Sequence, residues 1–345
     1  MMKNSRKLET FFIKENTMKK QIIAAAVAAS VSAVALADVS ITGAAKVNYT
    51  YSDKEAANTD TNQFKKEMDL KILGKTGDTS VVMNFGGGQF DSTDNATGGG
   101  TINLEDNYLT TKVGDVNLKV GTWDNGNNEL RTSARNDGKF AASTSVGGFD
   151  LTYNAGDAAE DETWVVATSM GPVSVSYEQK QTGETIKAAA TMGGVNVKYL
   201  GLPTDGAGED RDYIELSGKV ADIAVKVGQA NADTNTTISG DSWLGDFEGT
   251  GADGSGNSGA YDLDDGNDIT GIELSSSVAG NAVTFRNIQV SDDDGSVSKD
   301  VSINKIIVTR PLASGATFEF TYTDTDSDVA NEDSTVFDLE LAVKF

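Results

Sequence analysis

The chain has 345 residues, of which 52 are acidic and 28 basic, giving a formal charge of −24; it contains no Cys and no His. This charge disfavours nucleic-acid binding. The missing residues exclude disulfides, thiolate or imidazole zinc sites, and Ser-His-Asp or Cys-His catalysis. We therefore expect a protein that is not an enzyme and uses no cofactor.

The N-terminal segment predicts export. Residues 18–37 read MKKQIIAAAVAASVSAVALA, with two lysines, an apolar core and a small-x-small cleavage site ending at Ala37. A membrane anchor is the alternative, but the apolar core falls short of the ~20 residues a spanning helix needs. Residues 1–17 are interpreted as a misassigned start or an extended n-region. Cleavage after Ala37 leaves residues 38–345, with 22 basic and 50 acidic side chains and a formal charge of −28.

From residue 38 onward, apolar and polar residues alternate in short segments separated by turns. In the first segment, Val39, Ile41 and Val47 alternate with Ser40 and Thr42. This period of two is that of a β-strand, and helical spacing is nowhere sustained. We predict 18 strands, uncertain by two, at residues 39–51, 64–72, 80–86, 104–113, 115–122, 139–147, 149–155, 163–170, 172–179, 184–192, 194–200, 212–220, 222–229, 269–278, 281–290, 301–310, 315–323 and 335–345.

The connections between these segments also alternate. Short turns such as Gly114-Asp115, Gly147-Gly148 and Gly193-Gly194 alternate along the chain with longer loops rich in Asn, Asp and Gly. All short turns would then lie at one rim and all long loops at the other. This organisation predicts an all-β fold, a transmembrane antiparallel β-barrel of 16–18 strands with short periplasmic turns and long external loops.

A soluble β-sandwich would alternate as well, and the inward-facing residues separate the two folds. Lys71, Lys119, Glu178, Lys187 and Glu340 fall on the polar side of their strands. Charges there would be costly in a packed core but suit a water-filled lumen. Many apolar stripes also begin or end on an aromatic residue, as expected for girdles at the membrane interfaces. The girdle candidates are Tyr51, Phe64, Phe85, Tyr108, Phe149, Tyr153, Tyr177, Tyr199, Tyr213, Phe318, Tyr322, Phe337 and Phe345.

The last segment, STVFDLELAVKF, alternates up to the final residue. Phe337, Leu339 and Phe345 fall on one side, and Asp338 and Glu340 on the other. Terminal residues usually fray, so this regularity predicts that the last strand pairs with the first and closes the barrel. The terminal phenylalanine would then lie at the periplasmic interface.

These features resemble the general porins of the Gram-negative outer membrane. The resemblance covers residues 38–345 and rests on DVSITGAAKVNYTY, NYLTTKVGDVNLKVGTWDNG, with its Val113-Gly114 turn and Gly121, and the terminal LELAVKF. It departs from the family at Thr122-Trp123, where porins often carry Arg. The resemblance implies a homotrimer of water-filled channels in the outer membrane, which pass ions and small hydrophilic solutes by diffusion. It also implies that Phe345 is a signal to the outer-membrane assembly machinery.

The resemblance further implies that the third long loop folds into the pore and narrows it. By strand order this loop is residues 123–138, WDNGNNELRTSARNDG. An ordinary surface loop would be equally polar, so that interpretation stays open. Charge of opposite sign across a narrow aperture would orient dipolar solutes. The residues expected at the constriction are Asp124, Glu129, Asp137, Arg131 and Arg135 on the loop, and Lys46, Lys65, Lys71 and Lys119 on the barrel wall.

The overall negative charge and the acidic loops predict a weak preference for cations. Residues 232–268 hold nine acids and no base, and Asp262, Asp264, Asp265 and Asp268 are weak candidates for a Ca²⁺ or Mg²⁺ site. A solvated external loop, bridged loosely to lipopolysaccharide by divalent ions, is the simpler interpretation. The alternative function is a structural or adhesive outer-membrane barrel that is plugged and binds a partner through its acidic loops.

Overall fold

The computed structural model describes residues 38–54, 61–87, 102–123, 130, 136–156, 162–180, 183–203, 210–232, 243–244, 267–292, 299–328 and 333–345. The predicted signal peptide and the residues before it lie outside these ranges. No helix within these ranges is long and apolar enough to cross a membrane.

The described residues form one antiparallel sheet of 18 strands, the upper end of the predicted number. Each strand corresponds to one alternating segment, and most are longer than the segment by one or more residues. The strands are β1 (Asp38–Lys54), β2 (Thr61–Thr76), β3 (Thr79–Gly87), β4 (Ile102–Val113), β5 (Val116–Trp123), β6 (Asn136–Val146), β7 (Phe149–Ala155), β8 (Thr163–Met170), β9 (Val173–Lys180), β10 (Gly183–Met192), β11 (Val195–Leu202), β12 (Arg211–Val220), β13 (Ile223–Ala232), β14 (Asn267–Val278), β15 (Asn281–Asp292), β16 (Lys299–Pro311), β17 (Ala316–Ser327) and β18 (Ser334–Lys344).

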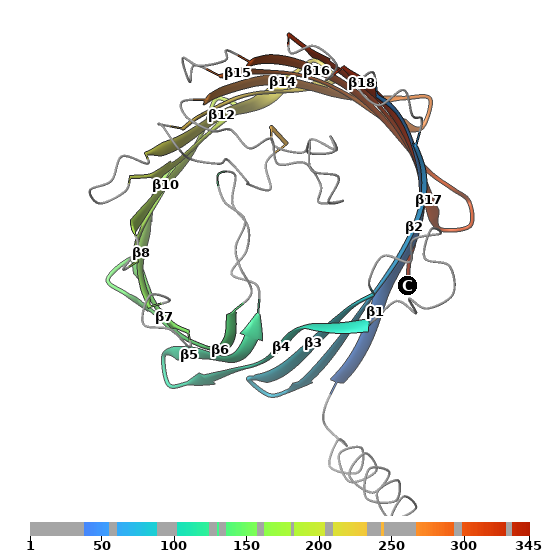
Figure 1. Ribbon diagram of the computed structural model, residues 1–345. Coiled ribbons are helices and arrows are strands. Elements are labelled where there is room, and N and C mark those ends of the chain that lie inside the picture. Colours follow the sequence, from blue (N-terminus) through green and yellow to red (C-terminus); the bar gives the residue numbers. More distant parts are fainter. Residues whose placement is uncertain are drawn as a thin grey trace, which may run out of the picture.

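The sheet closes into a barrel because β1 pairs with both β2 and β18 (Figure 1). The closing ladder runs from the pair Lys54 and Ser334 to the pair Ala44 and Lys344. It continues through the last residue, where the backbone N–H of Gly43 donates to the Phe345 carbonyl oxygen at 2.8 Å and the Phe345 N–H donates back at 3.0 Å. The last strand stays regular to its end because it pairs with β1, and this pairing leaves the sheet without a free edge.

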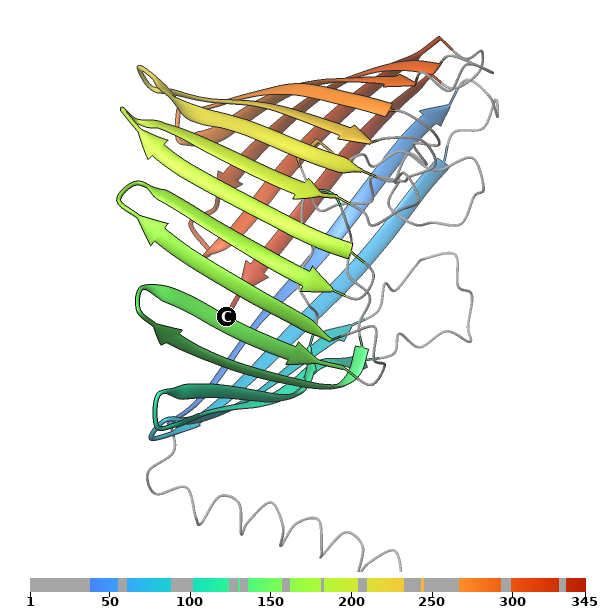
Figure 2. The ribbon, with the colours of Figure 1, turned by 90° about the vertical axis from the view of Figure 1, so that its left-hand side faces the viewer.

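The two rims differ as predicted. Every even-to-odd connection from β2–β3 to β16–β17 is a tight turn, and both glycines of Gly193-Gly194 have the positive φ (60° and 84°) of the turns that suit tight hairpins. The long connections lie at the opposite end, which we call the long-loop rim. The wall is uneven (Figure 2): β1 has 17 residues and β2 has 16, whereas β7 has 7 and both β8 and β9 have 8.

Alternation places apolar side chains on the outside of the barrel over most of its height. Ile41 is 60% exposed and Trp164 is 61% exposed. Three ring pairs join outward aromatics across β1, β18 and β17: Tyr51 with Phe337 at 6.2 Å, Tyr322 with Phe337 at 5.1 Å, and Phe320 with Phe337 at 6.4 Å between centroids. An apolar outer surface with groups of aromatic rings is typical of a barrel that lipid solvates.

Two of the expected girdle residues are on the other face. Tyr213 is fully buried inside the barrel, and Tyr108 lies under the lumen-side amine of Lys119. The prediction was wrong for both residues because the register pairs Tyr213 with Leu200 and Tyr108 with Val82, which are inward positions. An aromatic residue at a strand end does not by itself reveal which face it occupies.

Candidate functional site in the barrel lumen

The lumen side of β1 and β2 carries three of the predicted wall lysines. Lys46 forms a salt bridge with Glu67 at 2.8 Å, and both side chains remain partly exposed. Lys65 is the register partner of Asn48, and Lys71 is that of Thr42. These lysines therefore share one face with a carboxylate, so the wall there is mixed in sign and is not a purely basic row.

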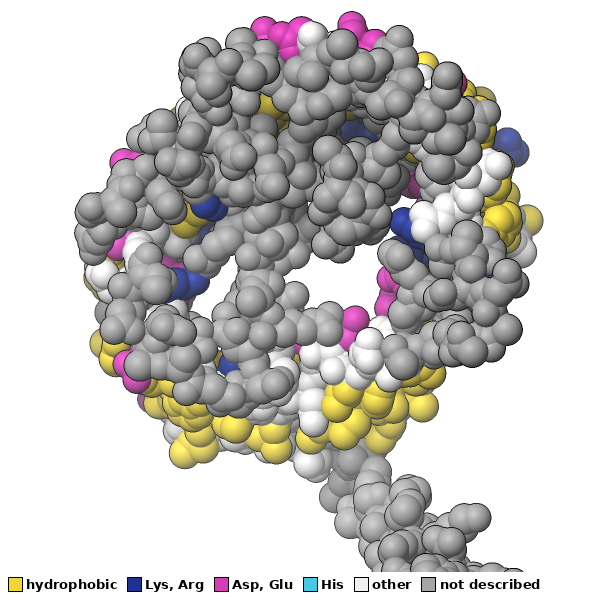
Figure 3. All heavy atoms as spheres, in the orientation of Figure 1, with side chains coloured by type: hydrophobic (Ala, Val, Ile, Leu, Met, Phe, Trp, Pro, Cys, Tyr) yellow, Lys and Arg dark blue, Asp and Glu magenta, His cyan; other side chains and the backbone are white. Residues whose placement is uncertain are grey.

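Carboxylates continue this wall on β17 and β18. Glu319 and Glu340 are register partners, and Asp338 accepts hydrogen bonds from the Asn48 Nδ2 at 2.9 Å and the Thr50 hydroxyl at 3.2 Å. Seen along the barrel, an opening passes through the ring beside β1 and β2, with acidic and basic side chains at its edge (Figure 3). Charged side chains around an open passage can act directly on a dissolved solute.

The fourth wall lysine, Lys119 on β5, is held between two aromatic rings. Its Nζ lies 3.9 Å from the centroid of Tyr108 and 4.2 Å from that of Trp123. Lys139 on β6 is buried and donates a hydrogen bond from its Nζ to the Trp123 carbonyl oxygen. Cation–π contacts of this kind favour a fixed ammonium position. The cluster fastens the start of the loop that follows β5 to strand β6.

This cluster lies where the pairing between β5 and β6 is irregular. The register between β5 and β6 shifts between Gly121 and Trp123, and Gly121 has a φ of 137°, a region that other residues rarely adopt. A Cβ at Gly121 would collide with the backbone of Asn107 and Tyr108. The glycine thus permits the close approach of β5 to β4 just before Trp123, whose side chain shares a face with Lys119.

The lumen also contains an apolar cluster that the sequence had not predicted. Its wall positions come from β11 to β16, and it includes two residues from long connections, Leu130 and Leu244, which are 0% and 1% exposed. Leu130 follows β5, yet its carbonyl oxygen accepts a hydrogen bond from Arg211 Nη1 of β12 at 3.3 Å. One point of the predicted constriction loop therefore contacts the inner wall some six strands away. The wall members are Leu200, Leu202, Tyr213, Ala230, Ile269, Ile288, Val290, Val301 and Ile303.

The cluster exists because alternation changes phase near the long-loop rim. On β15, Val283 and Phe285 face outward, whereas Ile288 and Val290 face inward and Gln289 faces outward. Gln289 Nε2 donates to the Ser302 hydroxyl at 2.8 Å on the exposed outer face. Near the long-loop rim the wall therefore carries polar side chains on its outer face and apolar side chains on its inner face. This pattern is expected where the outer face contacts water and the inner face is covered by other parts of the chain. The phase reversal was visible in the sequence and could have revealed this cluster.

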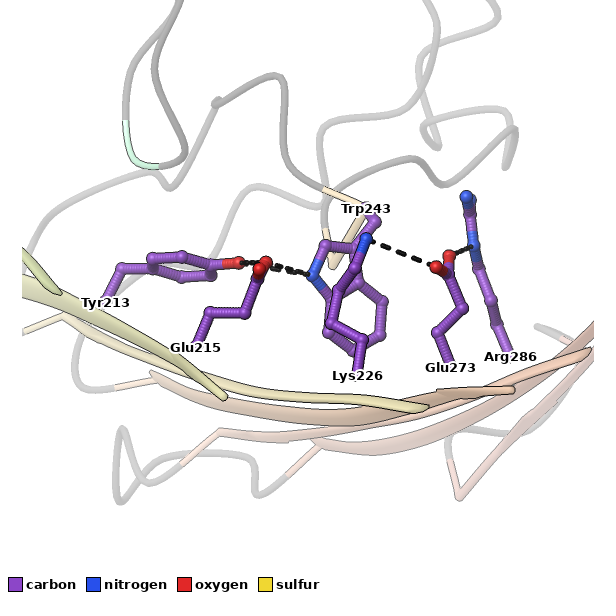
Figure 4. Close-up of polar contacts among 6 residues, drawn as sticks. All are labelled: Tyr213, Glu215, Lys226, Trp243, Glu273 and Arg286. Atoms are coloured by element: carbon purple, nitrogen blue, oxygen red, sulfur yellow. Dashed lines mark hydrogen bonds and ion pairs between the residues drawn. The ribbon is translucent and has the colours of Figure 1, made fainter. Parts of the chain in front are cut away.

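Trp243 lies beside the cluster, on the inner face of β12 to β14 (Figure 4). Its Nε1 donates to the Tyr213 hydroxyl and to Glu215 Oε2, each at 3.1 Å. Next to it, Glu273 accepts from Arg286 Nε at 2.6 Å and pairs with Lys226 Nζ at 3.2 Å. No sequence motif had singled out Trp243, because its neighbours in the chain are polar and irregular.

Several predicted site residues lie outside the described residues: Asp124, Glu129, Arg131, Arg135, Asp262, Asp264 and Asp265. Asp137 belongs to strand β6 and not to the loop, because the ladder between β5 and β6 resumes after the irregularity with Trp123 opposite Asn136. Asp268 lies at the start of β14 and is exposed. Within the described ranges, no group of three or more Asp, Glu, His or Cys could hold a metal ion.

The contact between Arg211 and Leu130 gives a first testable consequence. Replacing Arg211 with Met is expected to free the Leu130 segment, since a charged hydrogen bond contributes about 1.5–3 kcal/mol. In reconstituted protein that conducts, the expected result is a noisier single-channel current. Arg310→Met, which alters an exposed arginine on the outer face of β16, is the matched control and should leave the current unchanged. Equal noise in both variants would contradict a role for the contact.

The sequence matches no protein-family model and no curated protein. Its fold is similar to that of solved structures over nearly their whole length. Pseudomonas aeruginosa OpdL is 12% identical with a TM-score of 0.64, covering 89% of this chain and 99% of that one. A BenF-like porin from Pseudomonas fluorescens Pf-5 is 13% identical with a TM-score of 0.63, covering 90% and 99%. Acinetobacter baumannii OccAB4 is 9% identical with a TM-score of 0.63, covering 89% and 98%.

Such similarity at low identity establishes the fold, a closed 18-strand antiparallel β-barrel. Of these three neighbours, the Pseudomonas fluorescens protein is named a porin, and none is named a general porin, the type that the sequence resemblance had suggested. The prediction of a porin-like barrel is thus supported, and its assignment to the general type is not.

Proposed function

We propose that the protein is an outer-membrane channel of a Gram-negative bacterium that lets ions and small hydrophilic solutes diffuse through a water-filled barrel. The observation that carries this proposal is the contrast between the two faces of one closed sheet. Apolar side chains such as Ile41 and Leu341 face outward, while Lys46, Glu67 and Glu340 line the passage. A barrel whose outer surface lipid can solvate, and whose inner passage is lined by charged side chains, has the features of a channel.

Uptake by vesicles tests this proposal. Liposomes loaded with an impermeant polymer and containing the purified barrel should swell in isotonic solutions of small sugars, and more slowly as the sugar becomes larger. Liposomes with heat-denatured protein provide the control. The absence of swelling, with the barrel demonstrably inserted, would favour the alternative, a plugged barrel that binds a partner through its acidic loops.

We propose that the loop between Trp123 and Asn136 narrows the passage. The support is the burial of Leu130 against the opposite part of the wall and its hydrogen bond from Arg211. Replacing Asp124, Glu129 and Asp137 by their amides should lower the preference for cations, which we expect to be weak, because it removes three negative charges near the narrowest point. The measurement is the reversal potential in a KCl gradient. The same value in wild type and variant would remove these residues from the constriction.

Solute preference is a separate question. One structure of the same fold, Pseudomonas aeruginosa OccK2, is a complex with glucuronate; it is 10% identical to this chain, covers 89% of it and 98% of its own length, and has a TM-score of 0.63. Glucuronate is therefore a useful probe beside uncharged glucose. With acidic side chains at the passage, we expect glucose to enter faster than glucuronate.

We propose that three copies assemble through the side of the barrel where the wall is lowest, which is formed by β7, β8 and β9. Strands β7, β8 and β9 have 7–8 residues, fewer than the 9–11 that cross a bilayer, and they expose Trp164 and Met170. Packing against another copy would cover this short apolar face, and lipopolysaccharide and lipid would cover the taller strands. The mass of the cross-linked protein in detergent should then be three times that of the mature chain.

A further inference from the structure

Trp243 and Leu244 are two described residues of the connection between β13 and β14, and both contact the inner face of the wall (Figure 4). They pack on a seat made by Gly228 of β13 and Gly271 of β14, which are register partners and face the lumen. Two glycines side by side on an inner wall leave a flat backbone surface. The indole ring and the leucine side chain occupy that surface.

The seat requires that both positions lack a side chain. A Cβ at Gly271 would lie 2.5 Å from Leu244 Cδ2 and 2.9 Å from Trp243 Cζ3, and a Cβ at Gly228 would lie 2.9 Å from Trp243 Cζ2. Neither glycine has a positive φ, so backbone conformation is not what requires glycine there. The close approach of Trp243 and Leu244 is therefore the feature that these glycines serve.

Polar contacts fix the direction of the ring. The Trp243 N–H donates to Glu215 and to the Tyr213 hydroxyl, and that hydroxyl donates to Glu215 at 2.6 Å. Lys226 Nζ lies 5.3 Å from the indole centroid. A buried indole normally needs a partner for its N–H, and here the partner is a carboxylate whose own position is fixed by a tyrosine. The arrangement is specific to tryptophan and not merely apolar.

The seat is continuous with the contact made by Leu130. Leu130 and Leu244 belong to one apolar cluster although they come from connections after β5 and after β13. Both therefore occupy the lumen along the same arc of wall, from β11 to β16. The opening in Figure 3 lies on the other side of the ring, beside β1 and β2.

We propose that Trp243 and Leu244 are positioning residues of the channel. Seated on Gly228 and Gly271, they fill the lumen along β12 to β14 and confine the aqueous passage to the wall formed by β17, β18, β1 and β2. Solutes then pass the charged side chains of Lys46, Glu67 and Glu340. This inference rests on the proposed channel function, and it names the residues that set the position of the passage.

Single-channel recordings of two variants test the proposal. Trp243→Ala combined with Leu244→Ala should raise the conductance roughly 1.5-fold, because the emptied seat enlarges the aqueous cross-section. Gly271→Val should act in the same direction by displacing both side chains. Gly74→Val is the matched control, since a Cβ at this strand glycine meets nothing within 4 Å. Wild-type conductance in both seat variants would overturn the proposal and leave the channel function intact, whereas a silent wild-type protein would overturn the function itself.

Thiol labelling gives a second readout that does not depend on current. The chain contains no Cys, so a single introduced thiol can be followed without background. Ala230→Cys places it under the cluster, at a position that is 1% exposed. A small charged methanethiosulfonate should label it at least roughly tenfold faster when Trp243 and Leu244 are alanines. Glu67→Cys, on the open wall, should be labelled quickly in both backgrounds. Equal rates at Ala230→Cys in the two backgrounds would contradict the seat.

Discussion

Gly121→Val is expected to prevent the folded barrel from accumulating. The φ of 137° is strained for a residue with a Cβ, and that Cβ would collide with the backbone of Asn107 and Tyr108, which cannot move without breaking the ladder between β4 and β5. Strain of this kind and overpacking each cost about 1–3 kcal/mol. A displacement of the strand at Gly121 would also move Trp123 away from Lys119 and Lys139. The measurement is the fraction of heat-modifiable, folded barrel in detergent.

Gly114→Val tests whether this effect comes from the close approach of Gly121 to β4. Gly114 also has a positive φ, 61°, but a Cβ there meets nothing within 4 Å. Gly114→Val should therefore destabilise the barrel through backbone strain alone. A measurable fraction of this variant should still fold. A Gly121→Val protein that folds as well as Gly114→Val would show that the close approach of β4 and β5 is not required.

Phe345→Ala is expected to reduce the amount of barrel inserted into the outer membrane severalfold, without changing the conductance of each channel that does insert. The Phe345 ring is 62% exposed on the outer face and lies over Gly43, so it contributes to the closing seam and not to the lumen. Its backbone would still pair with Gly43. Quantifying the protein in purified outer membranes, followed by single-channel recording, separates the two effects.

Gly43 offers a test from the other side of the same contact. A Cβ at Gly43 would lie 2.6 Å from the Phe345 ring and 2.7 Å from the Asp69 carbonyl oxygen. Gly43→Ala should therefore displace the ring and lower insertion as Phe345→Ala does, and the two changes together should be no worse than the more severe one. Fully additive losses would mean that the two residues act independently.

Much of the barrel could be predicted from the sequence because its signal is local. A period of two assigns each residue to a face, and eighteen such segments joined by alternating short and long connections leave few other folds. The closure through Phe345 also followed from alternation, since a strand that stays regular to its end must have a partner on both sides. The inward orientation of Lys71, Lys119 and Glu340 was predicted in the same way.

The interior could not be predicted so well, because it depends on contacts between distant parts of the chain. Nothing local distinguishes Leu130 or Trp243 from the polar residues around them, and their positions follow from Arg211 on β12 and the glycines on β13 and β14. Tyr108 and Tyr213 were assigned to the outer girdle because aromatic residues at strand ends usually lie there. The phase reversal on β15 explains why the lumen is partly apolar.

The central claim is that the barrel is open to water from end to end. Purified protein in a planar bilayer of uniform composition, bathed in 1 M KCl, tests it most directly. The account predicts stepwise increases of current of one recurring size, with a reversal potential in a salt gradient that indicates a mild preference for cations. A bilayer that stays silent, although folded barrel can be recovered from it, would contradict the account.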